Sequence, residues 1–305
     1  MDATDPAGGC RGHRPGRPAP ALLPRPASTA RRGASTVADL VSADTYRAVL
    51  EELTAHPTRQ SFSEHYRATA GQATDRLAAL AYATRAEPVT VGAHETLNVI
   101  ADRPGTAEEA ERRLVYVTAH LDSINQTGGL DAPGADDNAS GAAGVLELAR
   151  VLTTVDNRHD LRFILFGGEE QGLYGSRAHV AGLSAADSSR IAAVINMDMI
   201  GRRNAGTPSV LLEGAPVSQP LIDDLARAAH DTGELEVFVS LDPYASDHVP
   251  FIDAGLPAVL TIEGHDELNN DEHTPRDILE ALDLTLAVAI LRMNATAIAD
   301  IATRA

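Results

Sequence analysis

Apolar residues recur along the chain in two different patterns. Spacings of three and four residues predict helices at 44–54, 63–84, 140–154, 172–183, 217–231 and 277–301. Short apolar runs predict strands at 114–119, 161–166, 191–197, 209–213, 236–240 and 257–262, and the β-type runs "VTV" and "LNVIA" lie within 88–101. Strands that alternate with helices form βαβ units, so we expect an α/β domain with a mainly parallel sheet covered on both faces.

The first 36 residues lack this pattern. They contain six Arg and six Pro with almost no apolar periodicity, so they cannot bury enough surface to offset the entropy lost on ordering. We therefore predict a disordered Arg/Pro-rich segment over 1–36 and one folded domain over 37–305. No apolar core of 7–15 residues follows these arginines, and Arg31-Arg32 lacks the apolar stretch of a twin-arginine signal. No signal peptide is expected, and the compartment stays open.

Composition narrows the range of partners. The formal net charge of −18 disfavours binding to the phosphate backbone of nucleic acids. No apolar run approaches the roughly 18 residues of a membrane span. With one cysteine, Cys10, the chain can form neither an intrachain disulfide nor a thiolate cluster, so any transition metal must be held by His and carboxylates. The sequence does not indicate the oligomeric state.

Side chains of the kind that bind metals follow the predicted strands or precede the helix at 140. The set comprises His120, Asp122, Asp136, Glu169, Glu170, Asp198 and His273. The carboxyl ends of parallel strands meet at one edge of a sheet, so we expect these groups to converge there. Unpaired carboxylates so close together would repel each other, and a bound cation removes that cost.

Two zinc ions would use about this number of ligands. Zinc accepts His nitrogen and carboxylate oxygen, and two zincs that share a carboxylate and a water lie ~3.5–4 Å apart. We assign Asp136 as the bridge, with His120 and Asp198 completing one ion and Glu170 and His273 the other. Taken singly, each residue has a simpler explanation, and Asp136 could merely cap the following helix. Convergence at one edge makes these explanations together improbable.

Two further carboxylates are expected to assist this site. Asp122, two residues after His120, can accept the free imidazole N–H and fix the orientation of the ring. Glu169 neighbours a ligand but is itself free of metal. It can take a proton from the bridging water and later deliver it to the leaving amine.

Six segments resemble the co-catalytic dizinc aminopeptidase family, which includes the bacterial leucyl aminopeptidases and M28-type peptidases. They are "AHLDS" at 119–123, "APGADDNASGAAGVLELAR" at 132–150, "FGGEEQGLYGS" at 166–176, "NMDMIG" at 196–201, "SDHVPFIDAGLPAVL" at 246–260 and "HTPRD" at 273–277. The resemblance spans about 90–300. It implies a central mixed sheet of the phosphorylase/hydrolase-like zinc exopeptidase fold, a single zinc peptidase catalytic domain over 37–305, and the same five ligands and general base.

Other features are implied by the resemblance alone. A cis peptide follows the bridging carboxylate in many family members, which would place it between Asp136 and Asp137. Tyr244 lies near the segment that carries the family's transition-state tyrosine and is expected to stabilise the oxyanion. We interpret Asp247 and His248 as structural neighbours of the site.

The expected function is aminopeptidase action on peptides or small amides, through a bridging hydroxide activated by two zinc ions and Glu169. Residues between 202 and 265 would line the pocket for the first side chain of the substrate. The resemblance implies that apolar substrate side chains are preferred. Carboxypeptidase, dipeptidase and amidohydrolase activities remain alternatives, because Arg202-Arg203 could bind a substrate carboxylate. A one-zinc glutaminyl cyclase fits the full ligand set less well, and a non-catalytic interaction module should lack stoichiometric zinc. The segment "GLYGS" is not a G-x-S-x-G elbow, which disfavours a serine hydrolase.

Overall fold

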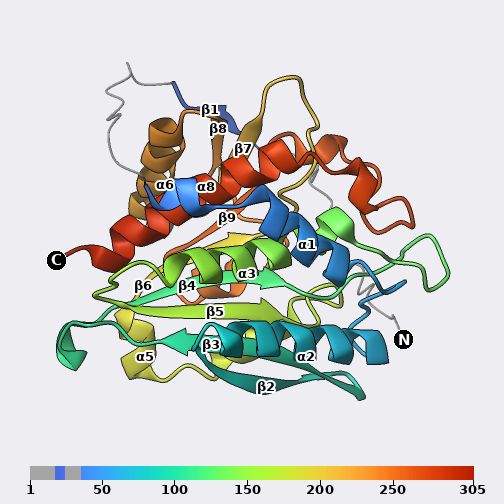
Figure 1. Ribbon diagram of the computed structural model, residues 1–305, viewed down its shortest axis with the longest axis horizontal. Helices are drawn as coiled ribbons and strands as arrows, with labels where there is room; N and C mark the ends of the chain where they lie inside the picture. Colours follow the sequence, from blue (N-terminus) through green and yellow to red (C-terminus); the bar gives the residue numbers. More distant parts are fainter. Residues whose placement is uncertain (1–17, 25–35) are drawn as a thin grey trace.

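A mixed β-sheet forms the centre of the molecule (Figure 1). The computed structural model describes residues 18–24 and 36–305. Within these residues the sheet has nine strands in the order β1-β8-β7-β9-β6-β4-β5-β3-β2. The strands are β1 (Ala21–Leu22), β2 (Ala83–Val91), β3 (His94–Arg103), β4 (Leu114–His120), β5 (Asp160–Phe166), β6 (Ile191–Met197), β7 (Ser209–Glu213), β8 (Glu236–Ser240) and β9 (Ala258–Glu263).

Parallel pairing is concentrated in the middle of the sheet. β4 pairs in parallel with both β5 and β6, and β6 pairs in parallel with β9. β7 and β8 are parallel to each other, whereas β2, β3 and β1 pair antiparallel and β7 is antiparallel to β9. The expected mixed α/β sheet is confirmed, but among the described strands four pairings are parallel and four are antiparallel, so parallel pairing does not prevail over the whole sheet. The four central strands β5, β4, β6 and β9 are parallel and end at the same edge.

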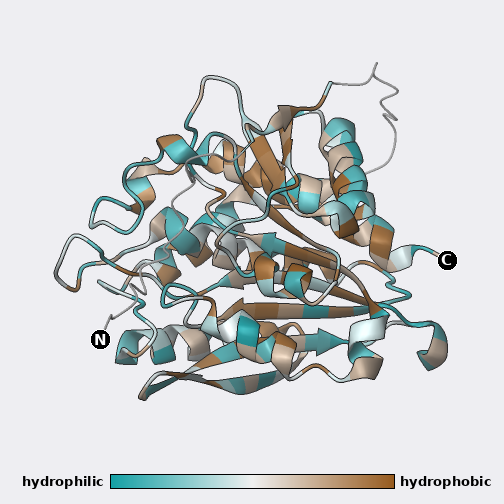
Figure 2. Ribbon diagram, turned by 180° about the vertical axis from the view of Figure 1, so that it is seen from behind, coloured by the Kyte–Doolittle hydropathy of each residue, from teal (hydrophilic) through white to brown (hydrophobic). Residues whose placement is uncertain are grey.

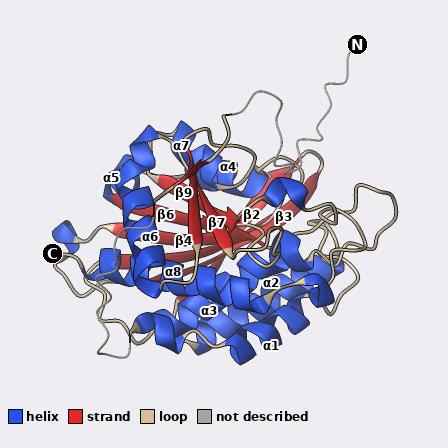
Figure 3. Ribbon diagram, turned by 90° about the horizontal axis from the view of Figure 1, so that it is seen from above, coloured by secondary structure: helices blue, strands red, loops and turns tan. Residues whose placement is uncertain are grey.

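Helices cover both faces of the sheet (Figure 3). They are α1 (Ala43–Leu53), α2 (Glu64–Ala79), α3 (Gly141–Leu152), α4 (Tyr174–Ala181), α5 (Ala185–Arg190), α6 (Gln219–Thr232), α7 (His248–Asp253) and α8 (Leu284–Thr303). One face packs against α1, α2, α3, α6 and α8 in the larger apolar cluster, and the other packs against α4 and α7. All seven residues of β4 are buried, as expected for a strand covered on both faces.

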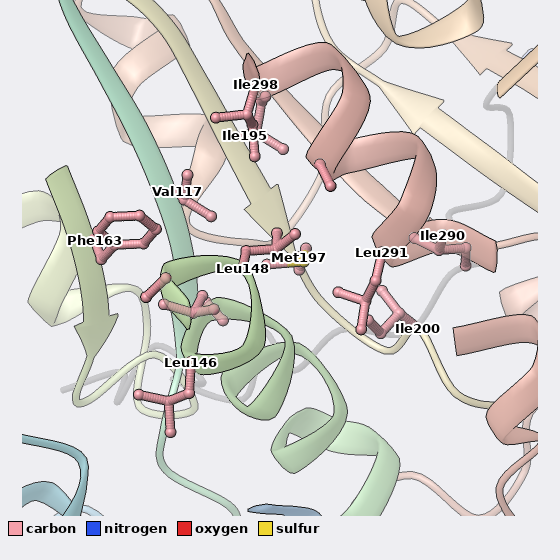
Figure 4. Close-up of a cluster of buried hydrophobic side chains, with 14 of the residues drawn as sticks. Val117, Leu146, Leu148, Phe163, Ile195, Met197, Ile200, Ile290, Leu291 and Ile298 are labelled. Atoms are coloured by element: carbon pink, nitrogen blue, oxygen red, sulfur yellow. The ribbon is translucent and has the colours of Figure 1, made fainter. Parts of the chain in front are cut away.

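Aliphatic side chains interlock between the sheet and its helices. In Figure 4, Val117 of β4 and Ile195 of β6 lie beside Leu148 of α3 and Ile298 of α8. The hydropathy colouring shows the central strands as largely apolar, with polar residues towards the loops (Figure 2). This core holds the strands rigidly, and the strands fix the positions of the loops at their carboxyl ends.

The six strands predicted between 114 and 262 agree with the structure to within one residue at each end, whereas β2 and β3 extend beyond the β-type runs found within 88–101. The helix predicted at 63–84 ends earlier, at Ala79, because β2 begins at Ala83. The helix predicted at 277–301 begins only at Leu284, where the Asp283 side chain accepts the N–H groups of the first turn. The short helices α5 and α7 were not predicted, since six residues give too little periodicity.

Part of the Arg/Pro-rich segment lies against the edge of the sheet. Ala21 and Leu22 pair with Val239 and Phe238 of β8, and the Leu23 N–H donates to the Val237 carbonyl at 2.9 Å. The expectation of disorder over 1–36 did not include this pairing. For residues 1–17 and 25–35, that expectation lies outside the described residues.

Helix α8 has the length and composition of a membrane-spanning helix. It has 20 residues, and 72% of its most apolar 18-residue window is buried inside the protein. It packs against α3 and α6 in the larger apolar cluster. The apolar character of α8 is therefore accounted for by its place in the core.

Candidate metal centre

The carboxyl ends of β4, β5 and β6 bring the predicted ligand groups together. His120 is the last residue of β4, Glu169 and Glu170 follow β5, and Asp198 follows β6. Ligand atoms of His120, Glu169 and Asp198 all lie within 4.8 Å of one another. His120, Asp137 and Glu170 form a second group of this kind. All of these side chains are buried.

Asp137, rather than Asp136, is the aspartate at the centre of this cluster. Its Oδ1 lies 3.1 Å from His120 Nε2, and its Oδ2 lies 2.8 Å from His273 Nε2. Asp198 Oδ1 lies 3.2 Å from His120 Nε2, and Glu170 Oε2 lies 3.0 Å from His273 Nε2. Each oxygen of Asp137 therefore faces one histidine, and each of these histidines also lies beside one further carboxylate, which defines two adjoining candidate ligand sets.

The assignment of Asp136 as the bridging residue is corrected by this geometry. Asp136 Oδ1 accepts the Gly201 N–H at 2.9 Å, and its Oδ2 accepts from Asn269 Nδ2 at 3.0 Å. Both residues lie in the turn η3 (Ala135–Ser140), where the backbone at Asp137 is not helical, so the two side chains point to different sides. The expected position of the cis peptide is corrected as well, because the cis bond joins Asp137 to Asn138.

Polar side chains hold this loop and its neighbours in place. The Asp277 carboxylate accepts the N–H groups of Asp136 at 2.8 Å and of Asp137 at 2.9 Å. The Ser246 hydroxyl donates to Asp198 Oδ2 at 2.6 Å. No role for Asp277 or Ser246 was predicted from the sequence, although Asp277 lies in the motif "HTPRD" and Ser246 in the motif "SDHVPF".

Burial and mutual charge govern the titration of the cluster. Burial, together with the charge of Asp137, raises the pKa of Glu170 to about 7. Burial would lower the pKa of His273, but Glu170 and Asp137 raise it to about 12. Burial would raise the pKa of Asp137, but His273 and His120 lower it well below its usual range. The charges of these carboxylates and imidazoles thus compensate one another only in part.

Several buried atoms of the candidate ligands lie close to one another but not in hydrogen-bonding geometry within the described part of the chain. They are both carboxylate oxygens of Asp137, both of Glu170, and Nε2 of His273. Buried polar atoms are nearly always satisfied by a hydrogen bond, so a group of them pointing at one space calls for another partner. Histidine nitrogen and carboxylate oxygen are the donor set that zinc accepts, so these residues fit that ion.

Asp122 joins His120 to the loop that carries the two glutamates. Its main-chain oxygen lies 3.2 Å from His120 Nδ1, and its Oδ1 lies 3.6 Å from the same atom. The carboxylate accepts the N–H groups of Glu169 at 3.4 Å and Glu170 at 3.3 Å. The imidazole N–H is thus closer to the main-chain oxygen than to the carboxylate that was expected to accept it.

Glu169 is buried beside the ligand cluster. Burial raises the pKa of its carboxyl group well above the usual range, although His120 opposes the shift. The Gly168 residue before it has a φ of 79°, a conformation that glycine adopts readily and that turns the chain sharply after β5. This turn brings Glu169 close to Asp198 and His120.

A cavity of about 400 Å³ opens beside Asp198. Its aliphatic and aromatic wall is formed by Leu211 of β7, Phe238 of β8, and Leu260 and Ile262 of β9. Other lining residues are Pro18, Ala19, Pro20, Glu213, Ser240, Tyr244, Ala245, Ser246, His265, Asp266 and Glu267. The cavity adjoins the ligand cluster, and much of its lining comes from the expected interval 202–265.

The loop that carries Tyr244 is anchored at a buried carboxylate. The Tyr244 N–H donates to Glu213 Oε1 at 2.6 Å, and His248 Nε2 lies 3.5 Å from the same oxygen. His248 and Asp247 are fully buried, and burial raises the pKa of Asp247 to about 7. Tyr244 therefore lies in the wall of the cavity that also includes Asp198.

The two arginines that follow the Asp198 motif face other carboxylates. Arg202 Nη2 lies 2.6 Å from Asp271, and Arg203 Nε lies 2.7 Å from Asp283. Neither arginine lines the cavity. The positive pocket that a C-terminal carboxylate would need is therefore not formed by Arg202-Arg203 in this cavity.

Comparison with known proteins agrees with this fold. Solved structures with the same fold include the LapA aminopeptidase of Legionella pneumophila, at a TM-score of 0.76 and 22% identity over 88% of this chain and 74% of that one. They also include BSAP, a zinc aminopeptidase from Bacillus subtilis, at a TM-score of 0.77 and 18% identity over 87% and 96%. The chain therefore has the same fold as these two structures. The sequence profile of peptidase family M28 matches residues 98–298, and the chain belongs to that family.

A curated relative is more similar in sequence. Aminopeptidase YwaD of Bacillus subtilis is 35% identical over 170 residues, which cover 55% of this chain and 36% of YwaD. The chain spans between about a third and a half of the length of the first curated relatives that it matches.

Proposed function

We propose that this protein is a zinc-dependent aminopeptidase that binds two zinc ions at the cluster. The observation that carries the proposal is the position of Asp137 between His120 and His273, with one carboxylate oxygen towards each ring. His120, Asp137 and Asp198 would hold one ion, and His273, Asp137 and Glu170 the other. The relatives named as aminopeptidases, and one solved structure described as a zinc aminopeptidase, support the same reaction and metal.

The bound zinc ions would supply Lewis-acid polarisation of the scissile carbonyl and a lowered pKa for an attacking water. The chain's own residues provide the proton transfer. Glu169 lies beside the candidate ligands and is not assigned as a ligand itself. Its carboxylate accepts a proton from that water and donates it to the leaving amine. In the chain without metal, burial raises the pKa of its carboxyl group well above the usual range, and the charge of bound zinc ions would act in the opposite direction. A carboxyl group under these two opposing influences can both accept and donate a proton.

The surroundings of the cluster favour recognition of a substrate amine over a substrate carboxylate. The residues that line the adjoining cavity include the carboxylates Asp198, Glu213, Asp266 and Glu267, and no arginine among the described residues lines it. A protonated or metal-directed α-amine is compatible with this negative lining, whereas a C-terminal carboxylate would be repelled. The apolar wall is suited to an aliphatic or aromatic first side chain.

Tyr244 is our candidate for the residue that acts on the carbonyl of the scissile bond. It lines the same cavity as Asp198, and its backbone is fixed through Glu213. We assign its phenol the role of hydrogen-bond donor to the developing oxyanion.

The test combines metal analysis with a matched pair of substrates. Purified protein should contain close to two zinc ions per chain and hydrolyse leucine p-nitroanilide in a chelator-sensitive reaction. N-acetyl-leucine p-nitroanilide, which lacks the free amine, should not be hydrolysed. Protein without stoichiometric zinc would overturn the proposal and favour a non-catalytic interaction module. Two zinc ions with cleavage only of peptides that carry a free C-terminal carboxylate would replace the aminopeptidase by a carboxypeptidase.

A further inference from the structure

Segment 57–61, between α1 and α2, contacts the loops that carry the candidate ligands. The Ala132 N–H donates to the Pro57 carbonyl at 2.7 Å, and Thr58 forms a parallel bridge with Ala132. The Arg59 N–H donates to Ser123 Oγ at 2.9 Å. The segment lies outside the region that matches the family profile, yet it is bound to both 121–123 and 132–134.

Arg59 is the centre of these contacts and is fully buried. Its guanidinium group donates to four main-chain carbonyls, those of Leu53 (3.3 Å), Leu121 (2.9 Å), Pro133 (2.5 Å) and Gly134 (2.8 Å). The planar guanidinium has donors in fixed directions, so it can hold several carbonyls at set distances. Burial lowers the pKa of Arg59 only to about 10, so the group is charged at neutral pH.

The carbonyls that Arg59 holds lie next to candidate ligands. Leu121 directly follows His120, and Gly134 precedes Asp137 by three residues. Gly134 has a φ of 53°, and a Cβ built there would lie 3.1 Å from Arg59 Nη2 and would collide with the Asp137 carbonyl oxygen. The close approach of Arg59 to this loop therefore depends on glycine at 134.

Ser61 links the same segment to the loop that carries the glutamates. Its hydroxyl donates to Asp122 Oδ2 at 2.7 Å and accepts the Gly168 N–H at 3.0 Å. The Asp122 carboxylate in turn accepts the N–H groups of Glu169 and Glu170. A single hydroxyl thus connects the ends of β4 and β5.

We propose that Arg59 and Ser61 are positioning residues that set the spacing of the three loops carrying His120, Asp137 and Glu169-Glu170. The inference rests on the proposed zinc site. Neither residue is among the candidate ligands, so both act through main-chain carbonyls and through Asp122. Residues that orient metal ligands typically change metal affinity or activity by about 10–100-fold when they are replaced. A residue that merely filled space would lower stability without changing zinc affinity.

The experiment measures zinc affinity of the full chain by competition with a chelating dye, for wild type, Arg59→Lys and Ser61→Ala. Lysine keeps the charge but cannot reach four carbonyls, so we expect both variants to bind zinc at least about 10-fold more weakly. We also expect a lower kcat for leucine p-nitroanilide with KM changed by less than about 2-fold, because the substrate cavity is untouched.

Ser63→Ala is the matched control. Ser63 caps α2 by accepting the Tyr66 N–H at 3.0 Å, and its side chain has no hydrogen bond to the ligand loops among the described residues. Its loss should therefore lower the melting temperature and leave zinc affinity unchanged. Folded Ser61→Ala with wild-type zinc affinity and kcat would overturn the positioning role, even if Arg59→Lys failed to fold. A wild-type protein that bound no zinc would instead overturn the proposed function together with this inference.

Discussion

Asp136 and Asp137 are adjacent in the sequence, but their carboxylates lie in separate environments. Asp137 faces the rings of His120 and His273, whereas Asp136 accepts hydrogen bonds from the Gly201 N–H and the Asn269 side chain. One carboxylate is therefore available to bridge two metal ions, and its neighbour serves the loop structure.

This division predicts opposite results for two conservative variants. Asp137→Asn should reduce zinc content below one ion per chain and abolish detectable hydrolysis, because a neutral amide is a poor bridging ligand. Asp136→Asn keeps an oxygen for the Gly201 N–H and should retain both ions. Metal analysis after gel filtration checks the pair. Equal zinc loss in both variants would mean that Asp136 is also needed at the ions.

Glu169→Gln should separate chemistry from metal binding. The amide cannot accept the proton, so we expect kcat to fall by about 10²–10⁴-fold while zinc content stays at the wild-type level. The measurement is hydrolysis of leucine p-nitroanilide alongside metal analysis of the same preparation. Loss of zinc in this variant would show that Glu169 acts as a ligand, in which case another base would be required.

The sequence predicted the set of ligand-bearing loops because the relevant signals are local. The buried strands of an α/β sheet are short apolar runs, and the groups that follow them are brought to one edge by parallel pairing. His120, Glu170 and Asp198 could be placed near one another from that rule alone. The choice between Asp136 and Asp137 could not be made in this way, since the backbone angles of an irregular turn decide where each side chain points.

Contacts between distant segments could not be predicted from the sequence, for a different reason. Arg59 lies 62 residues before Leu121 and 75 before Gly134, and nothing in the pattern around it indicates that it is buried. An arginine between two helices is usually exposed. Its role depends on four carbonyls that only the folded chain brings together.

The stabilising effect of zinc should grow with pH. Burial and the charge of Asp137 raise the pKa of Glu170 to about 7, so the folded metal-free protein binds this proton more tightly than the unfolded chain does. The stability of the metal-free protein therefore falls as pH rises from about 4 to 7. The raised pKa of His273 likewise makes stability fall with rising pH, beginning at about 6.5, the ordinary pKa of histidine. The lowered pKa of Asp137 adds stability that is already complete above about pH 5.

Zinc binding needs these groups deprotonated, so zinc affinity rises over the same range. The difference in melting temperature between zinc-loaded and chelator-treated protein should therefore be larger at pH 8 than at pH 6. Each proton that differs between folded and unfolded chains changes the unfolding free energy by about 1.4 kcal/mol per pH unit. Thermal melts at pH 6 and pH 8, with and without zinc, measure this difference in melting temperature. Asp137→Asn is the control and should show little effect of zinc at either pH. A zinc-dependent shift that shrank from pH 6 to pH 8 would contradict these pKa directions.

Filling the cavity beside Asp198 should change substrate preference without changing the metal site. Leu211 lies on β7 in the apolar wall, so Leu211→Phe removes space for the first side chain of the substrate. We expect kcat/KM to fall by about 10-fold or more for leucine p-nitroanilide and by less than about 2-fold for the alanine substrate, because a misfit of one or two carbons costs about 1–3 kcal/mol. Val217→Phe, at an exposed position outside the cavity, is the matched control and should leave both values unchanged. Equal losses for the two substrates in Leu211→Phe would show that the first side chain binds elsewhere.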